Sequence, residues 1–132
     1  YATEEHFNTA FKRSVAHGSN VILMQKSDLK SSIQYMAQAL RAGKNLMIFP
    51  EGRRTNTGEM GDFKKTFAIL AKELRVPIVP VRITGAFEAL PRHKSFPRPS
   101  KVTVEYLPAV MPDVTKSYDE IAEQVKKIIA QD

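Results

Sequence analysis

Apolar and polar positions alternate along the first half of the chain in a pattern that predicts helix, strand, helix and strand. Residues 3–15 carry apolar side chains at helical spacing, which predicts an amphipathic helix. Val21 to Met24 predicts a short buried strand. A second helix can be capped by Ser27 or Asp28 and ends at Gly43. Its predicted apolar face consists of Leu29, Ile33, Met36, Ala37 and Leu40.

The second half continues with elements separated by loops rich in glycine and proline. Residues 55–62 are polar with two glycines, which predicts a loop. Phe63 opens a predicted helix, and Ser117 with Glu120 forms a capping box for the last one. Residues 76–83 predict a strand, and its two prolines indicate an edge position or an irregular start. The other predicted segments are a short helix or loop at 85–90, an extended surface loop at 91–101 and a strand at 101–107.

Strands that alternate with helices indicate an α/β domain. The order strand, helix, strand over residues 21–49 has the spacing of a βαβ unit. Four predicted strands are few for a complete sheet of this class. At 132 residues, the chain corresponds to one domain or to part of one.

Composition narrows the possible functions. The sequence contains no cysteine, which excludes disulfides and cysteine-ligated metals. No apolar run approaches the roughly 18 residues that span a bilayer. The formal net charge of +6 suits anionic partners: nucleic acid, an anionic membrane surface or phosphorylated small molecules. A nucleic-acid function depends on this charge alone, because no aromatic-interleaved RNA signature is present.

The most informative stretch is Phe49-Pro50-Glu51-Gly52-Arg53-Arg54, which follows the apolar run that begins at Leu46. Pro50 ends a predicted buried strand, and Gly52 permits a positive φ and a close backbone approach. Two guanidinium groups follow, and each can bind phosphate or carboxylate in a bidentate way. The alternative is a polar turn with two solvated arginines.

This stretch, followed by Phe63-Lys64-Lys65 and by the Val-Pro-Ile-Val-Pro-Val run at 76–81, resembles the glycerophosphate acyltransferase family, which includes lysophosphatidate acyltransferases. The resemblance implies a glycerol-3-phosphate acyltransferase-like sheet flanked by helices. Residues 1–132 are then the C-terminal part of a single acyltransferase domain, incomplete at its N-terminus.

The resemblance also implies site residues. Arg54 takes the place of the family's phosphate-binding arginine, and Arg53 replaces the usual Thr or Ser. Glu51 is expected to orient Arg54 or to accept from a glycerol hydroxyl, and Gly52 keeps the turn close. Lys26 stands where the family has an upstream arginine. Lys64 and Lys65 are candidates for phosphate or headgroup contact, or for a solvated helix face.

The family's catalytic pair, a His and an Asp spaced H-x-x-x-x-D, does not occur in this sequence. The fifth positions after His6, His17 and His93 are Phe11, Ile22 and Arg98. We therefore assign no catalytic residue here, and we expect this chain alone to transfer no acyl group. The three histidines are expected to be structural or exposed.

The leading hypothesis is an O-acyltransferase that uses acyl-CoA or acyl carrier protein and acts on a glycerophosphate or lysophospholipid. It needs no metal or other cofactor. The parent protein would be peripheral on the cytoplasmic face of a membrane, in a bacterial cytoplasm, and fused domains are possible. The basic loop at 91–101 could lie on an anionic leaflet or be a solvated connection. The alternative function is a non-catalytic module that binds phosphate or a lipid headgroup.

Overall fold

The computed structural model of the chain describes residues 2–3, 23–24, 29–92, 94 and 96–131. β1 (Ala2–Thr3) pairs in parallel with β2 (Leu23–Met24). The strand predicted at residues 21–24 is confirmed at Leu23 and Met24. The helix predicted at 3–15 is wrong at Thr3, which belongs to β1, and its remaining residues lie outside the described part. The predicted caps Ser27 and Asp28 also lie outside it.

The predicted second helix is α2 (Leu29–Arg41). Met36 is completely buried, whereas Leu29, at the first turn, is 47% exposed. Gly43 ends the region as predicted, with φ of +74°. The Gly43 amide donates to the carbonyl of Leu40 and the Lys44 amide to that of Ala39, both at 3.0 Å. These two bonds form a Schellman motif, which satisfies carbonyls that the helix leaves open.

The strand predicted at Leu46–Phe49 is wrong, since residues 44–49 belong to no strand. The run is also not buried as a whole. Leu46 and Ile48 pack against the core, while Met47 and Phe49 are 54% and 53% exposed. A strand requires ladder hydrogen bonds, and no described segment pairs with this one in a sheet. The predicted βαβ unit is therefore not formed among the described residues.

The main core lies between α2 and α3 (Thr66–Leu74), where Met36 and Leu70 meet. The helix predicted from Phe63 starts at Thr66. In the segment before it, the Lys64 amide donates to the carbonyl of Pro50. α5 (Tyr118–Ala130) begins with the predicted capping box. It buries Ile121, Ala122 and Val125.

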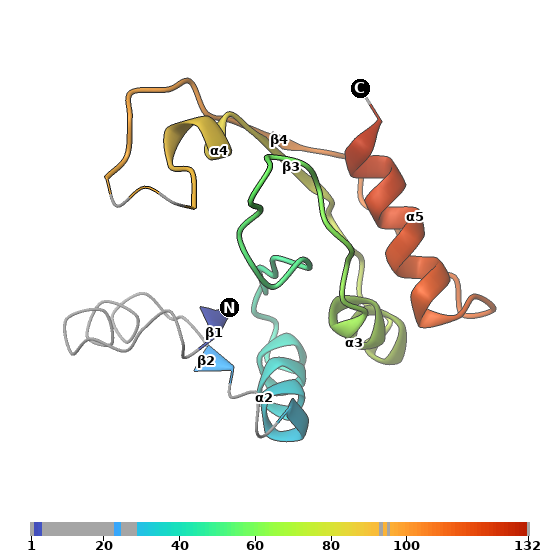
Figure 1. Cartoon of the computed structure of the whole chain (residues 1–132). Coiled ribbons are helices and arrows are strands. Elements are labelled where there is room, and N and C mark those ends of the chain that lie inside the picture. Colours follow the sequence, from blue (N-terminus) through green and yellow to red (C-terminus); the bar gives the residue numbers. More distant parts are fainter. Residues whose placement is uncertain (1, 4–22, 25–28, 93, 95, 132) are drawn as a thin grey trace.

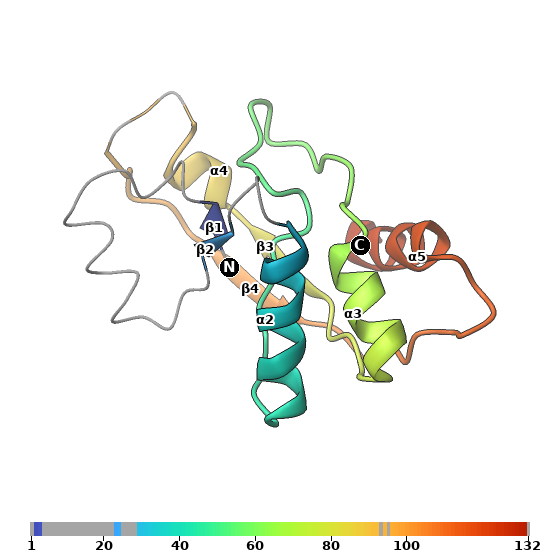
Figure 2. The same cartoon turned by 90° about the horizontal axis from the view of Figure 1, so that it is seen from below.

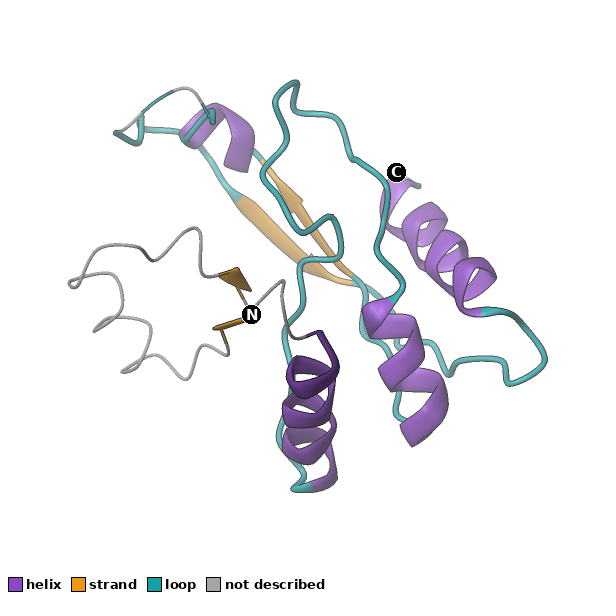
Figure 3. Ribbon diagram, turned by 60° about the horizontal axis from the view of Figure 1, so that its bottom comes forward, coloured by secondary structure: helices purple, strands orange, loops and turns teal. Residues whose placement is uncertain are grey.

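α3 lies between α2 and α5, and Figure 3 shows the three helices in a row. Two polar contacts link α3 with the start of α5. Lys72 Nζ donates to the carbonyl of Lys116 at 2.6 Å, and the Tyr118 hydroxyl donates to Glu73 Oε1 at 2.7 Å. The second bond raises the pKa of Tyr118 above its ordinary value. The helices thus form one packed layer.

β3 (Val81–Thr84) and β4 (Thr103–Tyr106) form an antiparallel ribbon, in which Val81 pairs with Tyr106 and Thr84 with Thr103. The irregular start predicted for the first strand is confirmed. Ile78 forms only an isolated bridge to Val110, and the carbonyl of Pro80 accepts from the Leu107 amide. The short α4 (Ala86–Ala89) follows β3. The predicted loop at 91–101 connects α4 to β4.

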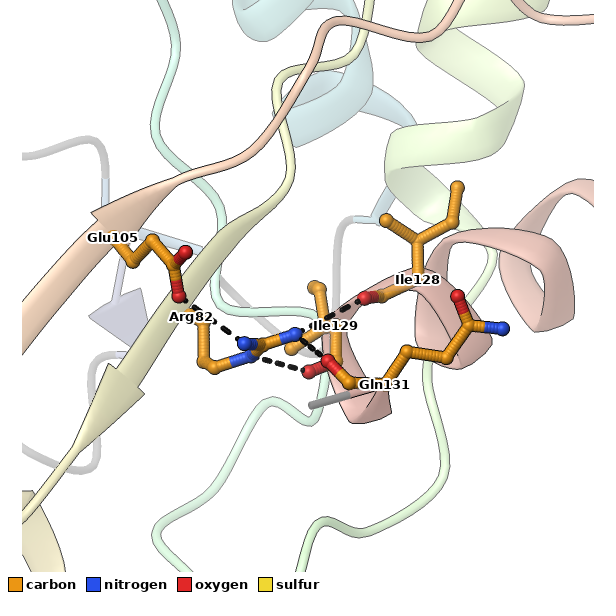
Figure 4. A network of polar contacts seen from close by, with 5 residues as sticks. All are labelled: Arg82, Glu105, Ile128, Ile129 and Gln131. Atoms are coloured by element: carbon orange, nitrogen blue, oxygen red, sulfur yellow. Dashed lines mark hydrogen bonds and ion pairs between the residues drawn. The ribbon is translucent and has the colours of Figure 1, made fainter.

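Arg82 connects this ribbon to the C-terminal end of α5, as Figure 4 shows. Its Nε donates to the carbonyl of Ile129 at 2.8 Å, and its Nη1 donates to Glu105 Oε2 at 3.1 Å. Its Nη2 donates to the carbonyls of Gln131 and Ile128. A cation therefore satisfies the open carbonyls at a helix C-terminus, where the helix dipole favours positive charge.

Candidate phosphate-binding site

Phe49 to Gly52 form a β-turn. The Gly52 amide donates to the carbonyl of Phe49 at 3.1 Å, which closes the turn. Proline is favoured at the second position of such a turn and glycine at the fourth, and Pro50 and Gly52 occupy these positions. Gly52 has φ of +67°, a conformation that other residues adopt only with strain.

Two hydrogen bonds fix this turn to the segment that leads into α3. Gly61 donates its amide to Glu51 Oε2 at 2.8 Å, and Lys64 donates its amide to the carbonyl of Pro50 at 2.9 Å. Glu51 therefore binds the backbone of the neighbouring segment. It makes no hydrogen bond with Arg54, so in this structure it orients the turn rather than that guanidinium.

The cations predicted to bind phosphate lie around Gly52. A Cβ built on Gly52 would lie 2.7 Å from Lys64 Nζ, which places the ammonium group directly against the turn. Arg53 and Arg54 are both exposed. Within the described part of the chain, neither arginine donates a hydrogen bond or forms an ion pair. Among the described residues, the side chains of Arg54 and Lys64 therefore have no hydrogen-bond or ion-pair partner, and Lys64 lies against the turn that Arg54 follows in sequence.

Charge around the turn is predominantly positive. Asp62 pairs with Lys126 of α5 at 2.9 Å, and this bond lowers the pKa of the Asp62 carboxyl, with a smaller contribution from Arg53. The same bond raises the pKa of Lys126. The turn therefore has four cations near it (Arg53, Arg54, Lys64 and Lys126) against the two carboxylates Glu51 and Asp62. This surplus of positive charge attracts the negative charge of a phosphate group.

Sequence reasoning missed Lys126. It lies more than sixty residues after the motif, next to a second lysine, Lys127, on the same helix, and no local pattern distinguishes it. Lys65, considered with Lys64, instead forms an exposed ion pair with Asp119 at 3.4 Å, away from Gly52. Lys26 lies outside the described residues, so its predicted place near phosphate stays a prediction.

The loop after the motif contacts α4 and the start of the basic loop at 91–101. Thr55 Oγ1 accepts from the amides of Thr57 and Gly58 at 3.2 and 3.1 Å, which stabilises the loop locally. Asn56 Oδ1 accepts from Arg92 Nη1 at 3.2 Å. A Cβ on Gly58 would lie 3.1 Å from the ring of Phe87 in α4. The motif loop and the basic loop are therefore neighbours.

The described part of the chain contains no group of three or more His, Cys, Asp or Glu side chains placed to hold a metal ion. None of its helices has the length and apolar character needed to cross a bilayer. A hollow of about 470 Å³ runs along α5, but the residues that line it come from 116–131 and include none of the motif.

Comparison with known proteins gives consistent results. The family model described as Acyltransferase matches residues 1–84. A 1-acyl-sn-glycerol-3-phosphate acyltransferase of Limnanthes alba is 36% identical over 111 residues, covering 81% of this chain and 39% of the relative. One from Cocos nucifera is 39% identical over 83 residues, covering 62% of this chain and 27% of the relative. The chain therefore spans less than half the length of these curated relatives.

The fold is also known. The crystal structure of the 1-acyl-sn-glycerophosphate (LPA) acyltransferase PlsC from Thermotoga maritima matches with a TM-score of 0.81 at 24% identity. The match covers 97% of this chain and 52% of that one. This likeness confirms the predicted α/β fold. Because the family model covers well over half of the 132 residues and includes the Phe49–Arg54 motif, the chain belongs to the acyltransferase family.

Proposed function

We propose that the protein to which this chain belongs transfers a fatty acyl group to the free hydroxyl of a lysophosphatidate or a related glycerophosphate during phospholipid synthesis. Membership of the acyltransferase family supports the reaction class. The names of the relatives, 1-acyl-sn-glycerol-3-phosphate acyltransferases, support the acceptor. The acyl donor in this proposal is acyl-CoA or acyl carrier protein.

The observation that carries the proposal is the pair of available cations at the Gly52 turn. Arg54 offers a planar fork of donors that fits two phosphate oxygens, while Lys64 adds a compact charge. The hydrogen bonds at Glu51 and Pro50 hold the turn in place before any ligand arrives. A preformed site loses little freedom on binding. The role of this chain is therefore to bind and orient the phosphate end of the acceptor.

The chemistry balances without a cofactor. The acceptor hydroxyl oxygen attacks the thioester carbonyl carbon, so a C–O ester bond forms and the C–S bond breaks. The hydroxyl proton passes to the leaving thiolate by way of a general base. In the family this base is the His of an H-x-x-x-x-D pair, which this sequence does not contain. We assign the phosphate-binding step to this chain and no proton-transfer step.

The acceptor is a lipid, so we place the protein at a membrane surface, as a peripheral protein on its cytoplasmic face. Relatives come from plant and chloroplast sources as well as from Mycoplasma pneumoniae. We propose that the protein is located on the cytoplasmic side of a bacterial membrane.

The test uses the complete reading frame that contains this chain, purified and supplied with acyl-CoA or acyl carrier protein and lysophosphatidate. Losing a charged hydrogen bond costs about 1.5–3 kcal/mol, so Arg54→Ala should raise the acceptor KM by about 10- to 150-fold. The KM for the acyl donor should not change. Arg41→Ala, an exposed arginine at the end of α2, is the matched control.

Two results would oppose the proposal in different ways. Unchanged acceptor kinetics in Arg54→Ala would remove this arginine from the site. Binding of lysophosphatidate without any acyl transfer by the complete protein would favour the alternative function, a non-catalytic module that binds phosphate or a lipid headgroup.

A further inference from the structure

A second surface combines positive charge with an exposed aromatic ring. We define the cationic loop by five described and exposed residues: Arg92, Lys94, Phe96, Arg98 and Lys101. Phe96 is 83% exposed, and no other large hydrophobic side chain in the described part of the chain is as exposed. The nearest acidic residues in sequence are Glu88 on α4 and Glu105 on β4. Burial of this ring against an apolar partner would add the free energy of removing its surface from water.

The loop that presents Phe96 has a fixed base. The Arg98 amide donates to the carbonyl of Ala89 at 2.7 Å, which closes the segment between them. Pro91 is buried, and the Lys94 amide donates to its carbonyl at 2.9 Å. At the far end, a Cβ on Gly85 would lie 2.0 Å from the carbonyl oxygen of Lys101. The Phe96 ring is therefore presented from a loop that is anchored to α4 and β3.

The combination of four cations and one aromatic ring fits the surface of an anionic bilayer. Basic side chains are attracted to the headgroups of anionic lipids. Phenylalanine is among the side chains that interfacial amphipathic helices bury at the boundary between headgroups and acyl chains. An acidic protein would satisfy the cations but would not by itself account for an apolar ring at the tip. We propose that the cationic loop docks on an anionic bilayer and inserts Phe96 between the headgroups.

The position of the loop next to the phosphate site supports a lipid surface as the partner. Arg92 is bonded to Asn56 of the motif loop, and Phe87 packs against Gly58. In Figures 2 and 3, the motif loop and the cationic loop extend toward the same end of the molecule, away from α2. Docking at this end would bring the Gly52 turn to the level of lipid phosphates. This orientation rests on the proposed function, whereas membrane binding itself does not.

The chain contains no tryptophan, so Phe96→Trp introduces a single fluorescent reporter at the tip of the loop. The probe is vesicles of phosphatidylcholine with or without phosphatidylglycerol, free of lysophospholipid. We expect the emission of Phe96→Trp to shift to shorter wavelength with anionic vesicles only, and to be quenched by lipids brominated in their acyl chains. Tyr35→Trp, a 66% exposed position on α2, should show neither effect.

Replacing two basic residues of the cationic loop with neutral ones tests whether their charge attracts the protein to anionic vesicles. Each basic residue near the surface contributes roughly fivefold to partitioning, so Lys94→Gln with Arg98→Gln should weaken vesicle binding by about thirtyfold. Lys30→Gln with Arg41→Gln removes the same charge from exposed positions on α2 and should weaken it much less.

Three outcomes would overturn the proposal. The Phe96→Trp reporter could stay unchanged when the protein sediments with anionic vesicles, so that another face docks. The two charge pairs could weaken binding equally, so that only net charge matters. An acidic acyl carrier protein could shift the reporter where vesicles do not, so that the loop binds a protein. Because these vesicles contain no acceptor, failure here leaves the proposed acyl transfer untouched.

Discussion

Replacing Arg82 with methionine should destabilise the fold, because it removes the guanidinium that joins β3 to the end of α5 while keeping most of the apolar stem. The best-formed bond is the one to the half-buried carbonyl of Ile129, at 2.8 Å. A hydrogen bond from a charged group contributes about 1.5–3 kcal/mol. The ion pair with Glu105 adds less than about 1 kcal/mol, since that carboxylate is 53% exposed.

A cation at the C-terminus of a helix adds about 0.3–1 kcal/mol. Because these contributions overlap, we expect a total loss of about 3 kcal/mol for Arg82→Met. For a chain of this size that corresponds to a fall in melting temperature of about 10 °C. Circular dichroism during heating measures it.

Glu105→Gln is the matched control, since it removes only the ion pair and should lower the melting temperature by no more than about 4 °C. If Arg82→Met melts within 2 °C of the unmodified chain, the bonds to the end of α5 contribute nothing and the reasoning fails. It also fails if Glu105→Gln is as destabilising as Arg82→Met.

Three further predictions concern the backbone and the pH dependence. Gly85→Ala should lower the free energy of unfolding, measured by urea denaturation, by at least about 2 kcal/mol more than Gly43→Ala. Both glycines have a similar positive φ, but only at Gly85 would the new Cβ lie 2.0 Å from a carbonyl oxygen. Equal losses of unfolding free energy in the two variants would contradict this prediction. Gly52→Ala should lower the free energy of unfolding by about 1–2 kcal/mol, because alanine is strained at this positive φ. The new Cβ would also displace Lys64, so the affinity for phosphate should fall. An unaltered affinity would exclude Lys64 from the site. Hydrogen bonds from Ser117 lower the pKa of Glu120 below 4.5. This stabilisation is present above pH 4.5 and is lost as pH falls through the folded-state pKa. Between pH 5 and pH 3, the melting temperature of Glu120→Gln should therefore fall by less than that of the unmodified chain. An equal fall in the two proteins would refute this role of Glu120.

Elements with strong local signals could be predicted from the sequence. Gly43 and the Ser117–Glu120 capping box determine helix ends through bonds within a few residues, and both predictions are confirmed. The start of α3 lies at Thr66 and not at the predicted Phe63. The segment before it is bonded through the Lys64 amide to Pro50, fourteen residues earlier, a contact that no local pattern encodes. The continuous apolar run at Leu46–Phe49 predicts a buried strand, but a strand also needs a paired neighbour. The run also does not show that only Leu46 and Ile48 pack against the core.

The candidate site was predictable only in part. The motif predicts Gly52 and Arg54 as site residues, and the family resemblance adds Lys64. The bond from Gly61 to Glu51 and the ion pair of Asp62 with Lys126 are tertiary contacts. No periodicity or spacing encodes them. The exposure of Phe96 could not be predicted either, because a sequence shows which side chains are apolar but not which of them remain exposed to solvent.

The most direct test of the phosphate site is a ¹H–¹⁵N NMR titration of the chain with glycerol 3-phosphate, with glycerol as the uncharged control. The account predicts saturable shifts of the backbone amides of Gly52, Gly61 and Lys64 and of the Arg54 Nε–H, none of them with glycerol. In Arg54→Ala the apparent Kd should rise at least tenfold. Shifts confined to residues away from the Gly52 turn, or equal shifts with glycerol, would contradict the assignment of this turn as a phosphate site.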